Sequence, residues 1–402
     1  MLSLCLLVWC VNDALTGWCG RPVGLKLLIT ASLALPLLQL VPLPPIMWHN
    51  LPGAGLALAS RSLIGAEREW FPLTTDAHRT LIAFASLLPA LAIVLFTPTR
   101  TGTAQAAMRV IVALGVLNFL IGLLQVVTNR NALLPYPLVE EGRFYGMFAS
   151  HNTSGLFFVI ALCALSGIRL PTDAAARHQL ALGAVAALFV LGAVLTQSRS
   201  SIALLLLPLG AFAVRWYRLH RSAQGPKSWK LAIGIIPAAA IVATFVASSE
   251  RINPSWERFE TLEDRRPQIW QDSAAALQTF FPMGSGMGSF DEVFQTFESL
   301  EHVAPTYARR AHNDYLELGI EAGAIGLALA ASWLLWVLMA WWRSRQGEER
   351  CEVDGIGLAL LAIALQSALD YPLRNQAMLC ITAFLIALLA ARPAGLRDGG
   401  HE

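Results

Sequence analysis

The residues best suited to chemistry form a short run in this 402-residue sequence, Ala311-His312-Asn313-Asp314-Tyr315-Leu316-Glu317, between a polar segment and an apolar one. Histidine takes up and releases protons near neutral pH, so His312 could serve as a general base. Asp314 and Glu317 have the spacing of a capping box, which predicts that a helix begins here. The free N–H groups and positive dipole of a helix start favour a phosphate nearby. The alternative is that His312 is an interfacial histidine that closes a loop.

Arginines stand at three further places that could serve the same site. Arg199 lies in a short turn between two apolar stretches, where an ionisable residue is costly and is a functional candidate by default. Arg265 and Arg266 precede a predicted amphipathic helix, and Arg374 ends the run Asp370-Tyr371-Pro372-Leu373-Arg374. The planar, permanently charged guanidinium suits phosphate oxygens. The alternatives are that Arg199 snorkels to lipid headgroups and that Arg265 or Arg266 is a solvated loop charge.

No residue pattern predicts a metal, a cofactor or a nucleic-acid partner. His, Asp and Glu show no metal-ligand spacing, and the six cysteines show neither metal nor redox spacing, so we interpret them as packing residues without disulfides. Gly284, Gly286 and Gly288 lack the strand–turn–helix context of a dinucleotide site and are expected to form a tight turn. The lack of a Walker motif argues against an ATP-driven pump.

The composition is that of a membrane protein. Hydrophobic residues make up 55% of the chain and charged residues only 14%, and the mean hydropathy is +0.55, whereas ordinary soluble domains carry about 25% charged residues. The predicted fold is all-α: a polytopic transmembrane helical bundle of about 10–12 spans, each long enough for a ~30 Å hydrocarbon core, with one larger extracytoplasmic loop. The expected spans are 23–41, 80–97, 105–127, 153–169, 180–197, 200–216, 231–248, 319–342, 354–370 and 375–391, preceded by a shorter, less regular segment at 2–16 that raises the question of an upstream helix.

The basic residues indicate the orientation. The connections at 216–230 and 343–350 are rich in lysine and arginine, which the positive-inside rule places in the cytoplasm. The turn at 197–200 and the segments 249–318 and 370–374 then fall on the outer face, so His312 and the candidate arginines gather on one side. The predicted organisation is an N-terminal transmembrane bundle at 1–248, a periplasmic loop with short helices at 249–318, and C-terminal transmembrane helices with a cytoplasmic tail at 319–402.

As a set, these motifs resemble the O-antigen ligase/polymerase superfamily, whose members share the Wzy-C domain. The family signature is His-Asn/Ser/Gln, nine residues and Gly-x-x-Gly, and here His312-Asn313 is followed after nine residues by Gly323-Ala324-Ile325-Gly326. Ser198-Arg199-Ser200-Ser201 is similar to the Ser-Arg turn of the family. Arg266-Pro267-Gln268-Ile269-Trp270, followed by the glycine-rich run that ends at Phe290, is similar to its loop motif. The resemblance covers residues 140–330.

The resemblance implies a GT-C-like glycosyltransferase of the bacterial inner membrane with its active site on the periplasmic face. Such an enzyme moves a preassembled glycan from undecaprenyl pyrophosphate to an acceptor hydroxyl by a metal-free, inverting displacement. A departing pyrophosphate needs positive charge and the hydroxyl needs a base, which suits the residues present. The residues carried over are His312 as general base, Arg199 and Arg266 (with Arg265 as its substitute) on the pyrophosphate, and Arg374, Asp314 and Asn313 as second-rank candidates.

The resemblance leaves the acceptor open. A lipid A–core acceptor would make the protein an O-antigen ligase, which the close match at His312 favours. A second lipid-linked repeat would make it a Wzy-type O-antigen or exopolysaccharide polymerase, and a protein acceptor a protein O-oligosaccharyltransferase. The alternative from another class is a transporter for polysaccharides or small molecules. It would predict broken helices or paired ionisable residues at mid-membrane and a repeat between the two halves, and the sequence shows neither.

Overall fold

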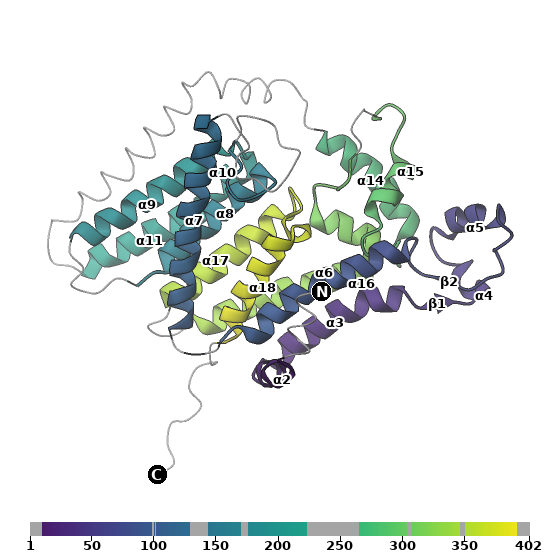
Figure 1. The fold of residues 1–402 in the computed structure, drawn as a ribbon, viewed down its shortest axis with the longest axis horizontal. Helices are drawn as coiled ribbons and strands as arrows, with labels where there is room; N and C mark the ends of the chain where they lie inside the picture. The colour runs from purple at the N-terminus through teal and green to yellow at the C-terminus, as the bar shows by residue number, and fades with distance from the viewer. Residues whose placement is uncertain are drawn as a thin grey trace, which may run out of the picture. The chain divides into compact units, whose positions relative to one another are not determined.

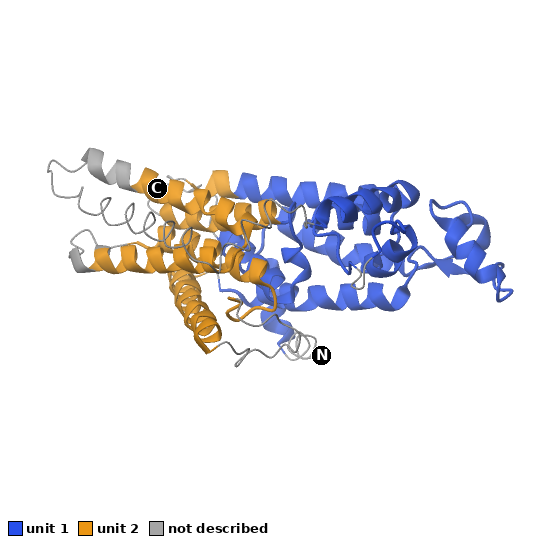
Figure 2. Ribbon diagram, turned by 90° about the horizontal axis from the view of Figure 1, so that it is seen from above, with its two compact units in different colours: residues 1–98, 264–340, 367–391 blue, residues 99–263, 341–366, 392–402 orange. Residues whose placement is uncertain are grey.

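The computed structural model describes residues 10–98, 100, 102–128, 144–169, 176–222, 265–303, 308–345 and 350–391. These residues are mostly helical, with a two-stranded antiparallel sheet that pairs Pro42 with Pro72 and Leu43 with Phe71 (Figure 1). The chain forms two compact units (Figure 2). One contains residues 1–98, 264–340 and 367–391, and the other contains residues 99–263, 341–366 and 392–402. The predicted all-α class is confirmed.

The first unit brings together the N-terminal helices, the segments around His312 and the last helix. Its elements are α2 (Val11–Cys19), α3 (Val23–Gln39), β1 (Pro42–Leu43), α4 (Pro45–Trp48), α5 (Ala54–Ser62), β2 (Phe71–Pro72), α6 (Ala77–Phe96), α14 (Arg266–Phe280), α15 (Phe290–Phe297), α16 (Asp314–Ser344, whose last residues belong to the second unit), η1 (Pro372–Arg374) and α18 (Gln376–Ala390).

The second unit is built around α8 (His151–Gly167), which is buried from Thr153 onwards. The helices that accompany it are α7 (Thr103–Thr128), α9 (Ala176–Leu195), α10 (Arg199–Leu204), α11 (Leu206–Ser222) and α17 (Arg350–Gln366).

The helices have the length and composition expected for a membrane. Within the described part of the chain, three helices, α6, α7 and α16, are long and apolar enough to cross a membrane. Shorter apolar helices lie at Val23–Gln39, His151–Gly167, Leu180–Leu195 and Gln376–Ala390. The protein is therefore a polytopic helical membrane protein, as its composition predicts. The predicted span at 231–248 and residues 2–9 of the first predicted segment lie outside the described residues.

One predicted span is divided. The sequence predicts a continuous helix at 200–216, but the structure has α10 up to Leu204 and a separate α11 from Leu206. Pro208 explains the division, because it has no N–H to donate to the carbonyl of Leu204, four residues earlier. Arg199 is consequently the first residue of a helix of only 6 residues.

Helix α16 is interrupted at Gly323 by the glycine-rich turn. Gly323 has φ +58° and ψ −145°, which is not helical. The turn supplies partners to the backbone groups on both sides of this break: the N–H of Ser285 donates to Ile320 O (2.9 Å), that of Gly286 to Glu321 O (2.8 Å), and Pro282 O accepts from Ala324 (2.9 Å). The predicted tight turn at 284–288 is confirmed, and it fixes the direction of the first turns of α16.

Gly323→Ala should destabilise the first unit. A Cβ at this position would lie 2.0 Å from Pro282 O, and the backbone conformation is one that side chains avoid. Strain of this kind costs about 1–3 kcal/mol, which would lower the thermal unfolding temperature of the purified protein. Gly55→Ala in α5 is the matched control, because a Cβ there meets nothing within 4 Å. Equal unfolding temperatures for the two variants would show that the break is not needed for folding.

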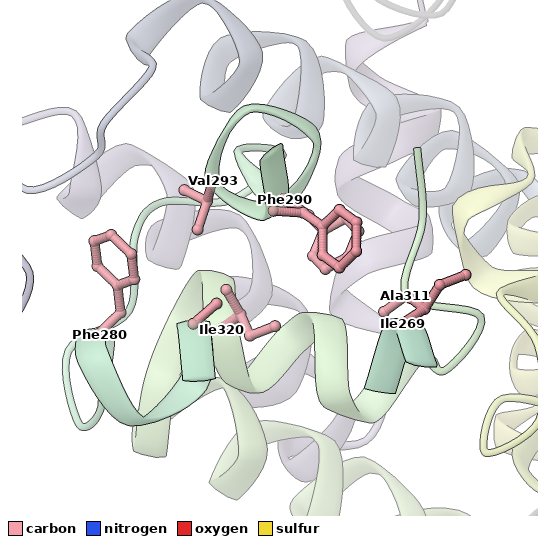
Figure 3. Close-up of a cluster of buried hydrophobic side chains, with 8 residues drawn as sticks. Ile269, Phe280, Phe290, Val293, Ala311 and Ile320 are labelled. Atoms are coloured by element: carbon pink, nitrogen blue, oxygen red, sulfur yellow. The ribbon is translucent and has the colours of Figure 1, made fainter. Parts of the chain in front are cut away.

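A buried apolar cluster holds α14 and α15 against the start of α16. Phe280 and Ile269 come from α14, Phe290 and Val293 from α15, and Ile320 from α16 (Figure 3). Ala311, the residue before His312, belongs to the same cluster and is fully buried. Burying apolar area is the main favourable term in folding, so this cluster anchors the backbone beside the candidate base.

Arg21 joins the ends of two helices of the first unit. Its side chain is buried, yet its hydrogen bonds go to carbonyls: Val94 and Thr97 (2.7 Å) at the end of α6, and Ala387 (3.2 Å) near the end of α18. Burial lowers the pKa of Arg21. The negative ends of two helix dipoles stabilise the positive charge in this place.

Candidate functional site

His312 lies two residues before α16 in a strained backbone conformation. Its φ is +50°, which is uncommon for a residue with a side chain. Its neighbours are fixed: Ala311 O accepts a hydrogen bond from Trp270 Nε1 (2.8 Å), and the N–H of Asp314 donates to Ser367 O (2.8 Å). The side chain of His312 remains 32% exposed. The fold thus presents this histidine at a surface on a rigid support.

The imidazole faces a carboxylate. Nδ1 of His312 lies 3.2 Å from Oδ1 of Asp370, whose side chain is only 8% exposed. The ring of Tyr371 meets the imidazole edge to face, with centroids 4.9 Å apart. A carboxylate at one ring nitrogen fixes the tautomer that leaves the other nitrogen, Nε2, able to accept a proton. The geometry is that of an oriented general base.

Asp370 can contact His312 because α17 ends before it, earlier than predicted. The predicted span ran over 354–370, but the helix ends at Gln366. The carbonyls of Ser367 and Asp370 both accept from the N–H of Asp314, at 2.8 and 3.3 Å. After α17 ends, residues 367–370 are hydrogen-bonded to the first residue of α16, and this contact places Asp370 beside His312.

The helix starts where predicted, but the cap is Asn313 rather than Asp314. Oδ1 of Asn313 accepts hydrogen bonds from the N–H groups of Tyr315 and Leu316, both at 3.0 Å, as expected for an N-cap. Asp314 instead bonds to Ser367 Oγ (2.9 Å) and to the N–H of Leu373 (3.1 Å). The capping-box prediction was wrong because these tertiary partners hold the Asp314 carboxylate.

Arg374 lies among three buried carboxylates. Its guanidinium is 2.7 Å from Glu321, 3.4 Å from Glu317 and 3.9 Å from Asp314. Both glutamates are fully buried, and Arg374 is 15% exposed. Burial alone would lower the pKa of Arg374, but the charges of Glu317, Glu321 and Asp314 raise it. The arrangement makes Arg374 the central cation of an ion network beneath the histidine.

Arg265 and Arg266 interact with different residues of the first unit. Nη2 of Arg265 donates to His302 O (2.6 Å) and lies 3.7 Å from Glu298. Arg266, the first residue of α14, contributes positive charge near Tyr371. Burial raises the pKa of Tyr371 and Asp370 raises it further, whereas the charges of Arg310 and Arg266 act in the opposite direction. Of the pair, Arg266 is therefore the one whose charge acts on the phenol that packs against His312.

The loop at residues 298–302, which contacts Arg265, is hydrogen-bonded to α14. Asp272 is 2.8 Å from His302 Nδ1 and accepts a hydrogen bond from Ser299 Oγ at 2.8 Å. Burial would raise the pKa of Asp272, but these hydrogen bonds and the charge of His302 lower it. The contacts give the segment before His312 a second anchor besides the apolar cluster.

Arg199 belongs to the second unit, where it is the exposed first residue of α10. The turn is polar and buried around it: Ser198, the N-cap, accepts from the N–H of Ser201 (3.4 Å), and the two hydroxyls are 2.8 Å apart. Ser201 also reaches Asn152 O at the start of α8 (3.4 Å). The described contacts of this turn are thus made by serine hydroxyls on both sides of Arg199.

The sequence predicted only some of the residues that the first unit brings together with His312. The first unit gathers His312, Asn313, Asp314, Arg266 and Arg374, and adds Asp370, Tyr371 and Arg310, which sequence reasoning did not choose as site residues. The run that ends at Arg374 contained the signal for Asp370 and Tyr371, because it places an acid and a phenol next to a candidate arginine. Within the described ranges, no group of three or more His, Cys, Asp or Glu side chains has the geometry of a metal site.

Asp370→Asn should lower activity while leaving the fold intact. The amide can keep the ring in place but cannot stabilise a proton on it, so we expect the loss to fall within the 10²–10⁴-fold range of a general base, at about 10². The measurement compares the reaction rates of Asp370→Asn and wild type at saturating substrate over a range of pH values. A rate unchanged from wild type would remove the carboxylate from the reaction.

Comparison with known proteins identifies one family. Residues 184–331 match the Wzy-C family model, described as O-antigen ligase, so the expected resemblance is confirmed over this part of the chain. The matched region contains Arg199, Arg265, Arg266 and His312 but ends before Asp370 and Arg374. No curated protein matches. A chain in the solved structure of a peptidoglycan synthase complex aligns with 93% of this chain and 98% of its own length, at 15% identity and a TM-score of 0.41, which is too low a likeness to support an argument.

Proposed function

We propose that this polytopic membrane protein is a glycosyltransferase that attaches O-antigen from undecaprenyl pyrophosphate to lipid A–core, because residues 184–331 match the O-antigen ligase family model. The observation that carries the proposal beyond the family match is the His312–Asp370 pair, an oriented base at a surface of the first unit. We place this surface on the periplasmic face of the bacterial inner membrane, in keeping with the distribution of lysine and arginine.

The proposed reaction is a single inverting displacement. The acceptor hydroxyl oxygen attacks the anomeric carbon as its proton passes to Nε2 of His312, and the bond from that carbon to the pyrophosphate oxygen breaks. The electron pair stays on the departing undecaprenyl pyrophosphate, so no nucleotide is consumed. Asp370 stabilises the imidazolium that forms. We expect no metal to be required, because guanidinium groups supply the positive charge.

The arginines have separate roles in this proposal. Arg266 and Arg199 bind the pyrophosphate, whose charge grows as it leaves. Arg265 is the less suitable of the loop pair, since it is held by Glu298 and His302. Arg374, Asp314 and Asn313 support the site instead of touching substrate, because their side chains are occupied by the ion network and the helix cap.

The test is a profile of lipopolysaccharide and of lipid-linked glycan in a deletion strain carrying the wild-type gene, no gene, or a His312→Ala gene. For a ligase, long chains disappear from lipid A–core and accumulate on the polyprenyl carrier without the active protein. Core molecules with a single repeat would indicate a polymerase. Profiles that do not change would contradict transfer to either acceptor.

A further inference from the structure

Arg310 is a second guanidinium beside the candidate base, two residues before His312. Its Nη1 donates to Oε1 of Glu317 at 2.7 Å. Unlike Arg374, which is 15% exposed, the Arg310 side chain is 37% exposed. Arg310 therefore combines a buried anchor at one end with access to a molecule that approaches His312.

Glu317 does not depend on Arg310 alone. The carboxylate also lies 3.4 Å from Arg374 and accepts a hydrogen bond from the N–H of Ala311 at 3.2 Å. A buried carboxylate that lost its only cation would be strongly destabilised. Because Glu317 would keep two of its three partners, Arg310 can leave it at a moderate cost.

Tyr371 offers a hydroxyl at the same place. Its ring packs against His312, and among the residues with described positions its hydroxyl makes no hydrogen bond to the protein. Since its pKa is raised, the phenol keeps its proton at neutral pH and can donate. The charges of Arg310 and Arg266 both act on this phenol. The two residues belong to different segments, since Arg266 begins α14 and Arg310 precedes Ala311.

We propose that Arg310 and Tyr371 are additional groups that bind the diphosphate of the lipid-linked donor, with Arg310 exchanging Glu317 for a phosphate oxygen when the donor arrives. This inference rests on the proposed function and deepens it. A diphosphate has two charged centres, and guanidinium groups from two segments can each take one while the phenol donates to an oxygen. Before the donor binds, the pairing with Glu317 balances the charge of Arg310.

The test measures binding of farnesyl diphosphate, a soluble prenyl diphosphate, to the full-length protein in lipid nanodiscs. Arg310→Gln should raise the Kd about tenfold or more, as expected when a hydrogen bond between charged groups is lost, and Tyr371→Phe should raise it about threefold. Arg79→Gln is the matched control and should leave the Kd unchanged, because Arg79 pairs with Asp291 and Glu292 on an exposed surface. A Kd for Arg310→Gln within twofold of wild type would overturn the assignment.

Two further variants separate a binding role from a structural one. Glu317→Gln releases Arg310 without removing it, so the exchange predicts a lower Kd than wild type. A Kd that does not fall would contradict the exchange. Arg266→Gln separates the proposed role of Arg310 from the proposed lipid-diphosphate donor. If Arg266→Gln weakens binding of farnesyl diphosphate and Arg310→Gln does not, only the role of Arg310 is contradicted. If the wild-type protein does not bind farnesyl diphosphate, the proposed lipid-diphosphate donor fails as well.

Discussion

Replacing His312 by Ala should abolish glycan transfer while leaving the protein folded in the membrane. The imidazole is 32% exposed and its contact with Asp370 is made by Nδ1, so the catalytic proton can reach Nε2. General base catalysis is worth about 10²–10⁴-fold, and the loss should fall in that range or below detection. The measurement is the rate of transfer by purified protein from a lipid-linked donor, beside the glycan profile of the strain.

His49→Ala is the control for this experiment. His49 is exposed in the same unit and its Nε2 bonds to the carbonyl of Glu67, with no contact to the candidate site. Transfer by His49→Ala should equal that of wild type. If His312→Ala also transferred at the wild-type rate, His312 would only close the loop before α16, and the base would have to be sought elsewhere.

Local patterns in the sequence predicted those features that depend on local physics. The apolar runs predicted the helices at 23–41, 80–97 and 105–127 to within three residues at either end, because length and hydropathy decide whether a helix can cross a membrane. The start of α16 was predicted by the polar residues before an apolar run. The helix predicted to follow Arg265 and Arg266, from Pro267, is α14, which begins one residue earlier, at Arg266.

The contacts of the site could not be predicted from spacing. Asp370 lies 58 positions from His312, and the two meet only because α17 stops four residues early to bond with Asp314. The same tertiary contact removed the Asp314 carboxylate from the predicted cap. The Gly-x-x-Gly signature indicated that glycine was needed at 323, but not that the turn at 284–288 supplies partners for the interrupted helix.

The electrostatics of the site separate supporting arginines from those available to a substrate. Arg374 faces three carboxylates and is mostly enclosed, so its charge is used within the protein. Arg310 has one carboxylate partner that it shares with Arg374, and its side chain is 37% exposed. The sequence predicted Arg266 as a pyrophosphate ligand and Arg374 as a second-rank candidate, and it did not select Arg310, because burial and partners decide what a charge can do.

Replacing Arg374 by Gln should therefore damage folding more than catalysis. The change leaves Asp314, Glu317 and Glu321 without their shared cation, and these side chains are at most 7% exposed. Removing one partner of a buried ion pair costs about 3–5 kcal/mol, which should lower the thermal unfolding temperature and the yield of monodisperse protein. Arg79→Gln removes an arginine that is 46% exposed and should cost about 0–1 kcal/mol.

A second substitution shows whether unpaired charge is the cause. In the Arg374→Gln background, Glu321→Gln removes the carboxylate that lies closest to Arg374, at 2.7 Å, so it should recover part of the lost stability. In the wild-type background the same change should destabilise, because it leaves Arg374 with one partner fewer. Opposite signs in the two backgrounds are the signature of direct coupling. If Arg374→Gln instead abolished transfer at unchanged stability, Arg374 would contact the substrate, and the ion network would be part of the binding site rather than its support.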